Sequence, residues 1–181
     1  MQINWQEIGP FDTWILWLMA AHRSEPCDYF FRYVTWVGSL VVLLPAAAMV
    51  TAALLYYRYR EEAMLLMFGF GGATLLCHLA KAILARPRPT AFAPLVEMPT
   101  DGSFPSAHTT QIVAFSLCLM LIIRRILPEW QGLAAAIAFL LVTAVAVSRI
   151  YLQVHFPSDV FGGVVIGVLW VACVPIVQKS L

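Results

Sequence analysis

Long apolar stretches constrain this chain more than any other feature of its sequence. A helix needs about 20 mostly apolar residues to cross a bilayer. Five charge-free stretches approach or exceed that length: residues 34–57, 63–80, 103–123, 131–148 and 160–178. Hydrophobic residues make up 61% of the 181 positions, and charged residues only 12%, against about 25% in soluble domains. The sequence therefore predicts an all-α, polytopic transmembrane helix bundle with five full spans, in a single domain of residues 1–181.

A sixth apolar stretch, residues 11–21, is too short to cross a bilayer. It carries Trp14 and Trp17, and tryptophan favours the boundary between water and lipid. We expect a short interfacial helix here, with a re-entrant or tilted segment as the alternative, which brings the helices to six in all. Pro45 lies within the first long stretch and is expected to kink it.

Charge patterning indicates the orientation and excludes some functions. Basic residues that follow the first, third and fifth spans are expected on one side of the membrane: Arg58, Arg60, Arg124, Arg125 and Lys179. The positive-inside rule makes that side cytoplasmic. The net charge of +1 and the lack of any Lys/Arg run argue against a nucleic-acid partner. The four cysteines show no metal-ligand spacing, and we interpret them as packing residues.

The outer side receives three polar groups from separate connections. The first contains Lys81, Arg86 and Arg88, the two arginines set among prolines. By itself this group also fits a basic anchor that snorkels to lipid headgroups, and snorkelling is the reading that we favour for Arg86. The second is Pro105-Ser106-Ala107-His108 at the expected start of a helix. We expect Pro105 in the first helical position, where unpaired N–H groups make a ready anion site.

The third group runs from Ser148-Arg149 to His155 and Asp159. Pro157 is expected to begin the last helix, which leaves His155 extended before it and Asp159 in the first turn. From there the Asp159 carboxylate could reach a His155 ring nitrogen and leave the other nitrogen free to attack. A plain helix cap by Asp159 is the alternative. Three cations, a helix N-terminus and two histidines at one membrane face suit a phosphoryl group.

These residues resemble the type 2 phosphatidic acid phosphatase superfamily, which includes the vanadium haloperoxidases. Its signature reads K-x6-R-P, P-S-G-H and S-R-x5-H-x3-D, and Lys81 through Arg88-Pro89, Pro105 through His108, and Ser148 through Asp159 match its spacing. Ala107 replaces the usual glycine, which we take as a tolerated change. The resemblance implies that His155 is the nucleophile, Asp159 its partner and His108 the general acid. It also implies that Lys81, Arg88, Ser106, Ala107 and Arg149 bind the phosphate.

The expected function is hydrolysis of a membrane lipid phosphate or diphosphate through a phosphohistidine, at the outer side of the cytoplasmic membrane. Undecaprenyl diphosphate is the first choice of substrate; phosphatidylglycerol phosphate, phosphatidic acid and lipid A phosphate are the others. No metal or other cofactor is expected. A lipid phosphotransferase with the same site is the alternative, and a non-enzymatic transporter or scaffold a remote one. The sequence does not indicate the oligomeric state.

Overall fold

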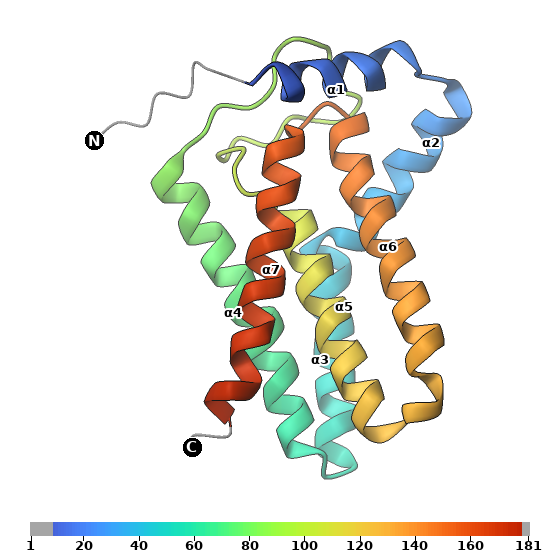
Figure 1. Cartoon of the computed structure of the whole chain (residues 1–181), viewed down its shortest axis with the longest axis vertical. Coiled ribbons are helices and arrows are strands. Elements are labelled where there is room, and N and C mark those ends of the chain that lie inside the picture. Colours follow the sequence, from blue (N-terminus) through green and yellow to red (C-terminus); the bar gives the residue numbers. More distant parts are fainter. Residues whose placement is uncertain (1–8, 179–181) are drawn as a thin grey trace.

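The chain is a bundle of helices that run side by side beneath one crossing helix (Figure 1). The computed structural model describes residues 9–178, with side chains to residue 174. Within that range no strand occurs, which confirms the all-α prediction. The helices are α1 (Pro10–Ala21), α2 (Glu25–Val34), α3 (Leu40–Tyr56), α4 (Arg60–Leu84), α5 (Ala107–Ile126), α6 (Gln131–Tyr151) and α7 (Pro157–Gln178), with short 3₁₀ turns η1 (Thr35–Gly38) and η2 (Pro128–Trp130).

Four of these helices are long and apolar enough to cross a membrane, and the first predicted span is different. The protein is therefore a multi-pass membrane protein, but residues 34–57 are not one straight helix. A fifth span exists only if α2 with η1 and α3 together cross the membrane, and these are bent by 43° at the break. The 17 residues of α3 would reach only about 26 Å, short of the roughly 30 Å hydrocarbon core.

The break lies at Ser39, ahead of Pro45, the position at which we expected a kink. Ser39 has extended backbone angles, and α3 continues through Pro45. The residues before the break form α2, a helix that we did not expect. Its start has ordinary helix signals, because Pro26 lies in the first turn with Glu25 and Asp28. The described chain thus has seven α-helices instead of the six predicted.

The short helix α1 lies across one end of the bundle, over the ends of α6 and α7 (Figure 1). Phe11, Trp14 and Trp17 on this helix are exposed, whereas Asp12 and Leu16 are buried. The helix therefore presents aromatic side chains outward and packs against the bundle with its other face. This placement agrees with the predicted interfacial helix.

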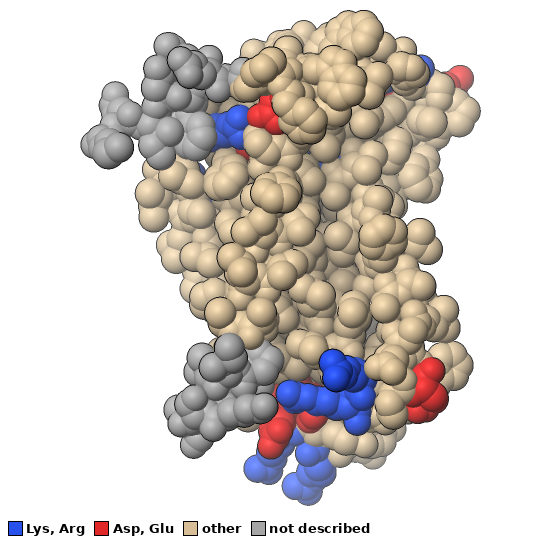
Figure 2. Space-filling model, viewed as in Figure 1, with Lys and Arg blue, Asp and Glu red and all other residues tan. Residues whose placement is uncertain are grey.

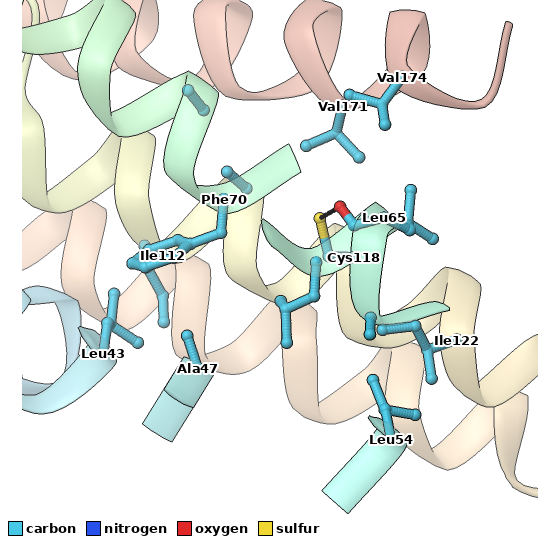
Figure 3. Packing of buried hydrophobic residues seen from close by; sticks show 14 of the residues in the cluster. Leu43, Ala47, Leu54, Leu65, Phe70, Ile112, Cys118, Ile122, Val171 and Val174 are labelled. Carbon is cyan, nitrogen blue, oxygen red and sulfur yellow. Dashed lines mark hydrogen bonds between the residues drawn. The ribbon is translucent and has the colours of Figure 1, made fainter. Parts of the chain in front are cut away.

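Helix α5 forms the centre of the bundle and contacts α3, α4, α6 and α7. Figure 3 shows the apolar core that results, with Ile112, Cys118 and Ile122 of α5 facing side chains from the surrounding helices. Cys118 is buried, and its thiol donates to the carbonyl oxygen of Leu65 at 3.7 Å. The core fixes α4, α5 and α7 relative to one another, and so fixes the loops at their ends.

Two glycines explain how closely α7 approaches α5. A Cβ atom on Gly163 would lie 2.9 Å from the Ser106 carbonyl oxygen, and one on Gly167 would lie 2.8 Å from Val113. A spacing of four residues between small side chains permits such close packing. The structure shows that this pair packs within the chain.

On the face that Figure 2 shows, charged side chains gather at the two ends of the molecule, with an uncharged band between them. Arg58, Arg60, Arg124 and Arg125 lie at or next to the α3–α4 and α5–α6 turns, at the end opposite α1. Lys179, which we assigned to the same side, lies outside the described residues. The segment from Ala85 to Ser106 joins α4 to α5 at the α1 end.

Candidate active site

A cavity of about 500 Å³ opens at the α1 end of the bundle. We refer to it as the active-site cavity. The side chains that line it come from η1, from α3 to α6 and from the segments after α4 and α6. Among them are six of the eight predicted site residues: Lys81, Arg88, Ala107, His108, Arg149 and His155. Three loops far apart in the sequence therefore meet at one membrane face.

The end of α4 directs Lys81 and Arg88 to the same cavity. Helix α4 ends at Leu84, and Ala85 adopts a left-handed conformation with φ of 42°. The chain then passes Pro87 and Pro89, which keep the helix from continuing, and returns to α4 at Gly102. A Cβ atom on Gly102 would lie 2.9 Å from the Lys81 carbonyl oxygen. Only glycine allows this approach, which brings Asp101 against both cations.

Asp101 binds two of the three cavity cations. Its carboxylate accepts from the Arg88 guanidinium at 2.6 Å and lies 3.1 Å from the Lys81 ammonium. Burial alone would raise the pKa of Asp101, but the hydrogen bonds and charges of Arg88 and Lys81 outweigh it and lower that pKa. Asp101 is thus an anion inside the cation cluster, a feature that our reading of the motifs missed.

Arg149 reaches the cavity from the last turn of α6. It is buried, and one of its terminal nitrogens donates to the Thr35 hydroxyl at 2.6 Å. Its Nε has no hydrogen-bond partner among the described residues. Thr35 lies in η1, so the break in the first predicted span positions a site arginine. Arg149 keeps a donor for an anion in the cavity.

The start of α5 differs from our prediction. The first helical residue is Ala107 and the N-cap is Ser106, so Pro105 precedes the helix instead of occupying its first position. Ala107 and His108 line the cavity, whereas Ser106 is not among the described lining residues. The Ser106 hydroxyl is buried and accepts from Thr109 at 3.0 Å. The helix end, not the serine side chain, is what faces the cavity.

His155 and Asp159 meet at the start of α7. The last helix begins at Pro157, as predicted. His155 Nδ1 lies 3.3 Å from Asp159 Oδ2, and this same oxygen accepts from the Phe156 N–H at 2.9 Å. Asp159 therefore both caps the helix and holds the histidine, so the two readings that we weighed apply together. An Nδ1–H donated to Asp159 leaves Nε2 unprotonated with its lone pair, and a terminal nitrogen of Arg88 lies 3.3 Å from it.

The surroundings of His155 keep its imidazole neutral. Burial lowers its pKa to about 3, and the Arg149 and Arg88 charges act in the same direction against the raising effect of Asp159. A neutral imidazole has the lone pair that a nucleophile needs. His155 is only 1% exposed, so water has little access to the ring.

Arg86 does not snorkel, contrary to our interpretation. It is 7% exposed, and it donates to Asp159 Oδ1 at 2.5 Å and to Asp12 Oδ2 at 3.2 Å. Ser103, which we counted in a span, donates to the other Asp159 oxygen. Sequence reasoning missed Asp12 and Ser103. The only signal was a polar residue inside an otherwise apolar stretch.

A membrane-embedded helix bundle with a cation-lined cavity around a neutral, carboxylate-held histidine is an arrangement that suits phosphoryl transfer. The PAP2 superfamily model matches residues 62–180. Phosphatidylglycerophosphatase B of Bacillus subtilis (strain 168) is 32% identical over 139 residues, which cover 75% of this chain and 68% of that protein. The chain belongs to the PAP2 superfamily and is a phosphoric ester hydrolase of that family.

Two further relatives extend the match over nearly the whole chain. An undecaprenyl-diphosphatase of Sulfolobus acidocaldarius is 28% identical over 179 residues, covering 97% of this chain and 81% of that protein. The crystal structure of the first transmembrane PAP2 type phosphatidylglycerolphosphate phosphatase from Bacillus subtilis has a TM-score of 0.85 at 28% identity. That match covers 94% of this chain and 85% of the other.

Proposed function

We propose that this protein removes a phosphate group from a lipid phosphate or diphosphate by forming a phosphohistidine at His155 Nε2. One observation carries the proposal: a neutral imidazole, held at Nδ1 by Asp159, lines a cavity that also contains three cations. Cations around a transferring phosphoryl group stabilise the charge on its equatorial oxygens. The location of the cavity at the membrane face lets a lipid headgroup enter while its tails stay in the bilayer.

The phosphate-binding groups are Lys81, Arg88 and Arg149, with the backbone N–H groups at the start of α5. The free Nε of Arg149 and the N-terminus of α5 are donors that can bind phosphate oxygens. Ala107 retains its N–H, so replacement of the usual glycine leaves this contact possible. For Ser106 we propose an indirect contribution through the helix start, because its hydroxyl contacts Thr109.

The reaction proceeds in two displacement steps. His155 Nε2 attacks the phosphorus, the bond between phosphorus and the lipid oxygen breaks, and His108 donates a proton to that oxygen. Water then attacks the phosphohistidine, gives a proton back to His108, and breaks the N–P bond to release inorganic phosphate. Asp159 holds the Nδ1 proton through both steps, so the ring keeps its orientation.

Undecaprenyl diphosphate is our first choice of substrate. The relative named for that activity aligns with 97% of this chain. Phosphatidylglycerol phosphate is the second candidate, supported by the Bacillus subtilis relatives in sequence and structure. We place the active site on the outer side of the cytoplasmic membrane. The arginines near the α3–α4 and α5–α6 turns lie at the opposite end of the molecule, and the positive-inside rule assigns that end to the cytoplasm.

The test is phosphate release by the purified protein in detergent, with undecaprenyl diphosphate, phosphatidylglycerol phosphate and phosphatidic acid as separate substrates. We expect turnover with at least one lipid, an acid-labile and alkali-stable phosphoprotein, and inhibition by orthovanadate, which mimics five-coordinate phosphorus. His155→Ala should remove turnover and labelling while the protein stays folded. Normal phosphate release by that variant would overturn the nucleophile assignment. Addition of an acceptor lipid separates hydrolysis from phosphotransfer.

A further inference from the structure

Arg86 lies behind the nucleophile, outside the active-site cavity. The described residues that line the cavity include Arg88 but not Arg86. The Arg86 guanidinium stacks over the Phe156 ring, with 4.4 Å between Cζ and the ring centroid. One terminal nitrogen donates to Asp159 Oδ1 and to the Ser158 hydroxyl at 2.8 Å, and the other donates to Asp12. The guanidinium therefore bridges two buried carboxylates, one in α7 and one in α1.

The two oxygens of Asp159 have separate partners. Oδ2 accepts from the Phe156 N–H and the Ser103 hydroxyl and lies next to His155 Nδ1. Oδ1 is bound by Arg86. With both oxygens bound, the carboxylate plane is fixed, and the plane sets the direction in which the imidazole points. A buried carboxylate oxygen without its cation would be costly, so loss of Arg86 should let Asp159 reorient.

Asp12 holds Arg86 from the other side. This carboxylate is 5% exposed, although it belongs to a helix whose aromatic side chains face outward. It accepts from Arg86, from the Ser158 N–H at 2.9 Å and from the Ser158 hydroxyl at 2.5 Å. The crossing helix α1 is thereby attached to Ser158 in the first turn of α7, three residues after His155.

We propose that Arg86 and Asp12 form a positioning pair for the nucleophile, in which Arg86 orients Asp159 and Asp12 orients Arg86. It follows that His155 has the orientation needed for attack on phosphorus only when α1 is docked on the bundle. This inference rests on the proposed function of His155. Neither residue lies at a position of the three-part signature, and neither contacts the cavity in which the phosphate binds.

The pair also affects proton binding at His155. Among the described residues, Asp159 of α7 contacts that ring. The other charged or titratable groups that line the cavity with it are His78, Lys81, Arg88, Glu97, Asp101, His108 and Arg149. Arg86 compensates the charge of Asp159. Without Arg86, the carboxylate acts more strongly on the imidazole and favours its protonated form. The acid limb of kcat/KM should then move to higher pH.

The experiment compares Arg86→Met, Arg86→Lys, Asp12→Asn and the double variant Asp12→Asn/Arg86→Met with the wild type. The probe is dioctanoyl phosphatidic acid, a soluble lipid phosphate. Because the pair acts through another residue, we expect a loss of about 10–100-fold in kcat for Arg86→Met, with KM within about twofold. The acid limb should rise in Arg86→Met, stay close to the wild type in Arg86→Lys, and shift less in Asp12→Asn.

The double variant and a control distinguish a specific effect on the orientation of His155 from a nonspecific loss of structure. Two residues of one unit are not additive, so the double variant should be no slower than Arg86→Met. Arg32→Met, which changes an exposed arginine on α2, should match the wild type. Unmoved acid limbs, a raised KM with normal kcat, or additive losses would overturn the pair. If Arg86→Met fails to fold, Asp12→Asn carries the test, because a normal kcat and an unmoved acid limb in that variant would also overturn the pair. A wild type inactive on every lipid phosphate would instead overturn the proposed function.

Discussion

At the scale of the residue, the site depends on how each ionisable group is paired. His155 shares Asp159 Oδ2 with a backbone N–H, while Arg88 and Lys81 share Asp101. The motif spacing predicted that Asp159 reaches His155, since a carboxylate in the first turn lies close to the residue before it. It did not predict Asp101 between the cations, because that contact depends on the path of the Ala85–Ser106 segment.

The first prediction concerns the charge of His155. Its pKa is lowered to about 3, so the ring should remain neutral as the pH falls from 7.5 to 5, where an ordinary histidine becomes protonated. Nitrogen NMR of the protein with ¹⁵N-labelled histidine should show an Nδ1–H tautomer throughout that range. The His155→Ala variant identifies the signal. A titration with a midpoint near 6.5 would contradict the prediction.

The second prediction concerns Asp101, which competes with phosphate for two cations. Its lowered pKa keeps it ionised at neutral pH. Asp101→Asn should therefore tighten orthovanadate inhibition. The carboxylate is 45% exposed, so the gain should be about 1 kcal/mol, or roughly fivefold in the inhibition constant.

Glu97→Gln provides the matched control, because Glu97 lines the same cavity and carries the same charge. It should change vanadate inhibition less than Asp101→Asn does. An equal effect of the two substitutions would mean that only the total cavity charge matters. Unchanged inhibition in Asp101→Asn would rule out the competition.

At the scale of the element, helix starts and breaks position the chemistry. Pro157 begins α7 and Ser106 precedes α5, and the break at Ser39 brings η1 against Arg149. Hydrophobic length predicted where the four long helices lie, because bilayer thickness and helix rise require it. It did not predict the break, since residues 34–57 are apolar on both sides of it.

The third prediction tests the contact between α5 and α7. Gly163→Ala would place a methyl group 2.9 Å from the Ser106 carbonyl oxygen. The nearest atom is backbone and cannot rotate away, so we expect a loss of about 1–3 kcal/mol in the free energy of unfolding. Thermal unfolding in detergent, followed by tryptophan fluorescence, measures it.

Gly71→Ala in α4 is the control for this substitution. No heavy atom lies within 4 Å of a Cβ atom at that position, so the change should be neutral or should stabilise by up to about 1 kcal/mol through helix propensity. Equal melting temperatures for Gly163→Ala and the wild type would show that the helices can separate at no cost.

At the scale of the whole molecule, an uncharged band separates two charged ends on the face that Figure 2 shows. The active-site cavity lies at the α1 end. The fourth prediction is that this end faces outward. Single cysteines at Thr90 and Glu129, in a chain whose four native cysteines are replaced by serine or alanine, report the two ends. A membrane-impermeant maleimide should label Thr90→Cys in intact cells, and Glu129→Cys only after permeabilisation. The reverse pattern would place the active site in the cytoplasm.

The sequence by itself determined that the chain lies in a lipid bilayer and is helical, because a bilayer demands long apolar helices. It also determined the family, because chemistry at phosphorus demands particular side chains at particular spacings. It could not determine the bent first span, the docking of α1 or the partners of Arg86. Those depend on contacts between residues far apart in the chain, such as Asp12 with Ser158 and Thr35 with Arg149. A local sequence pattern reports on residues that are neighbours along the chain, whereas the partner of a buried charge depends on how the helices pack.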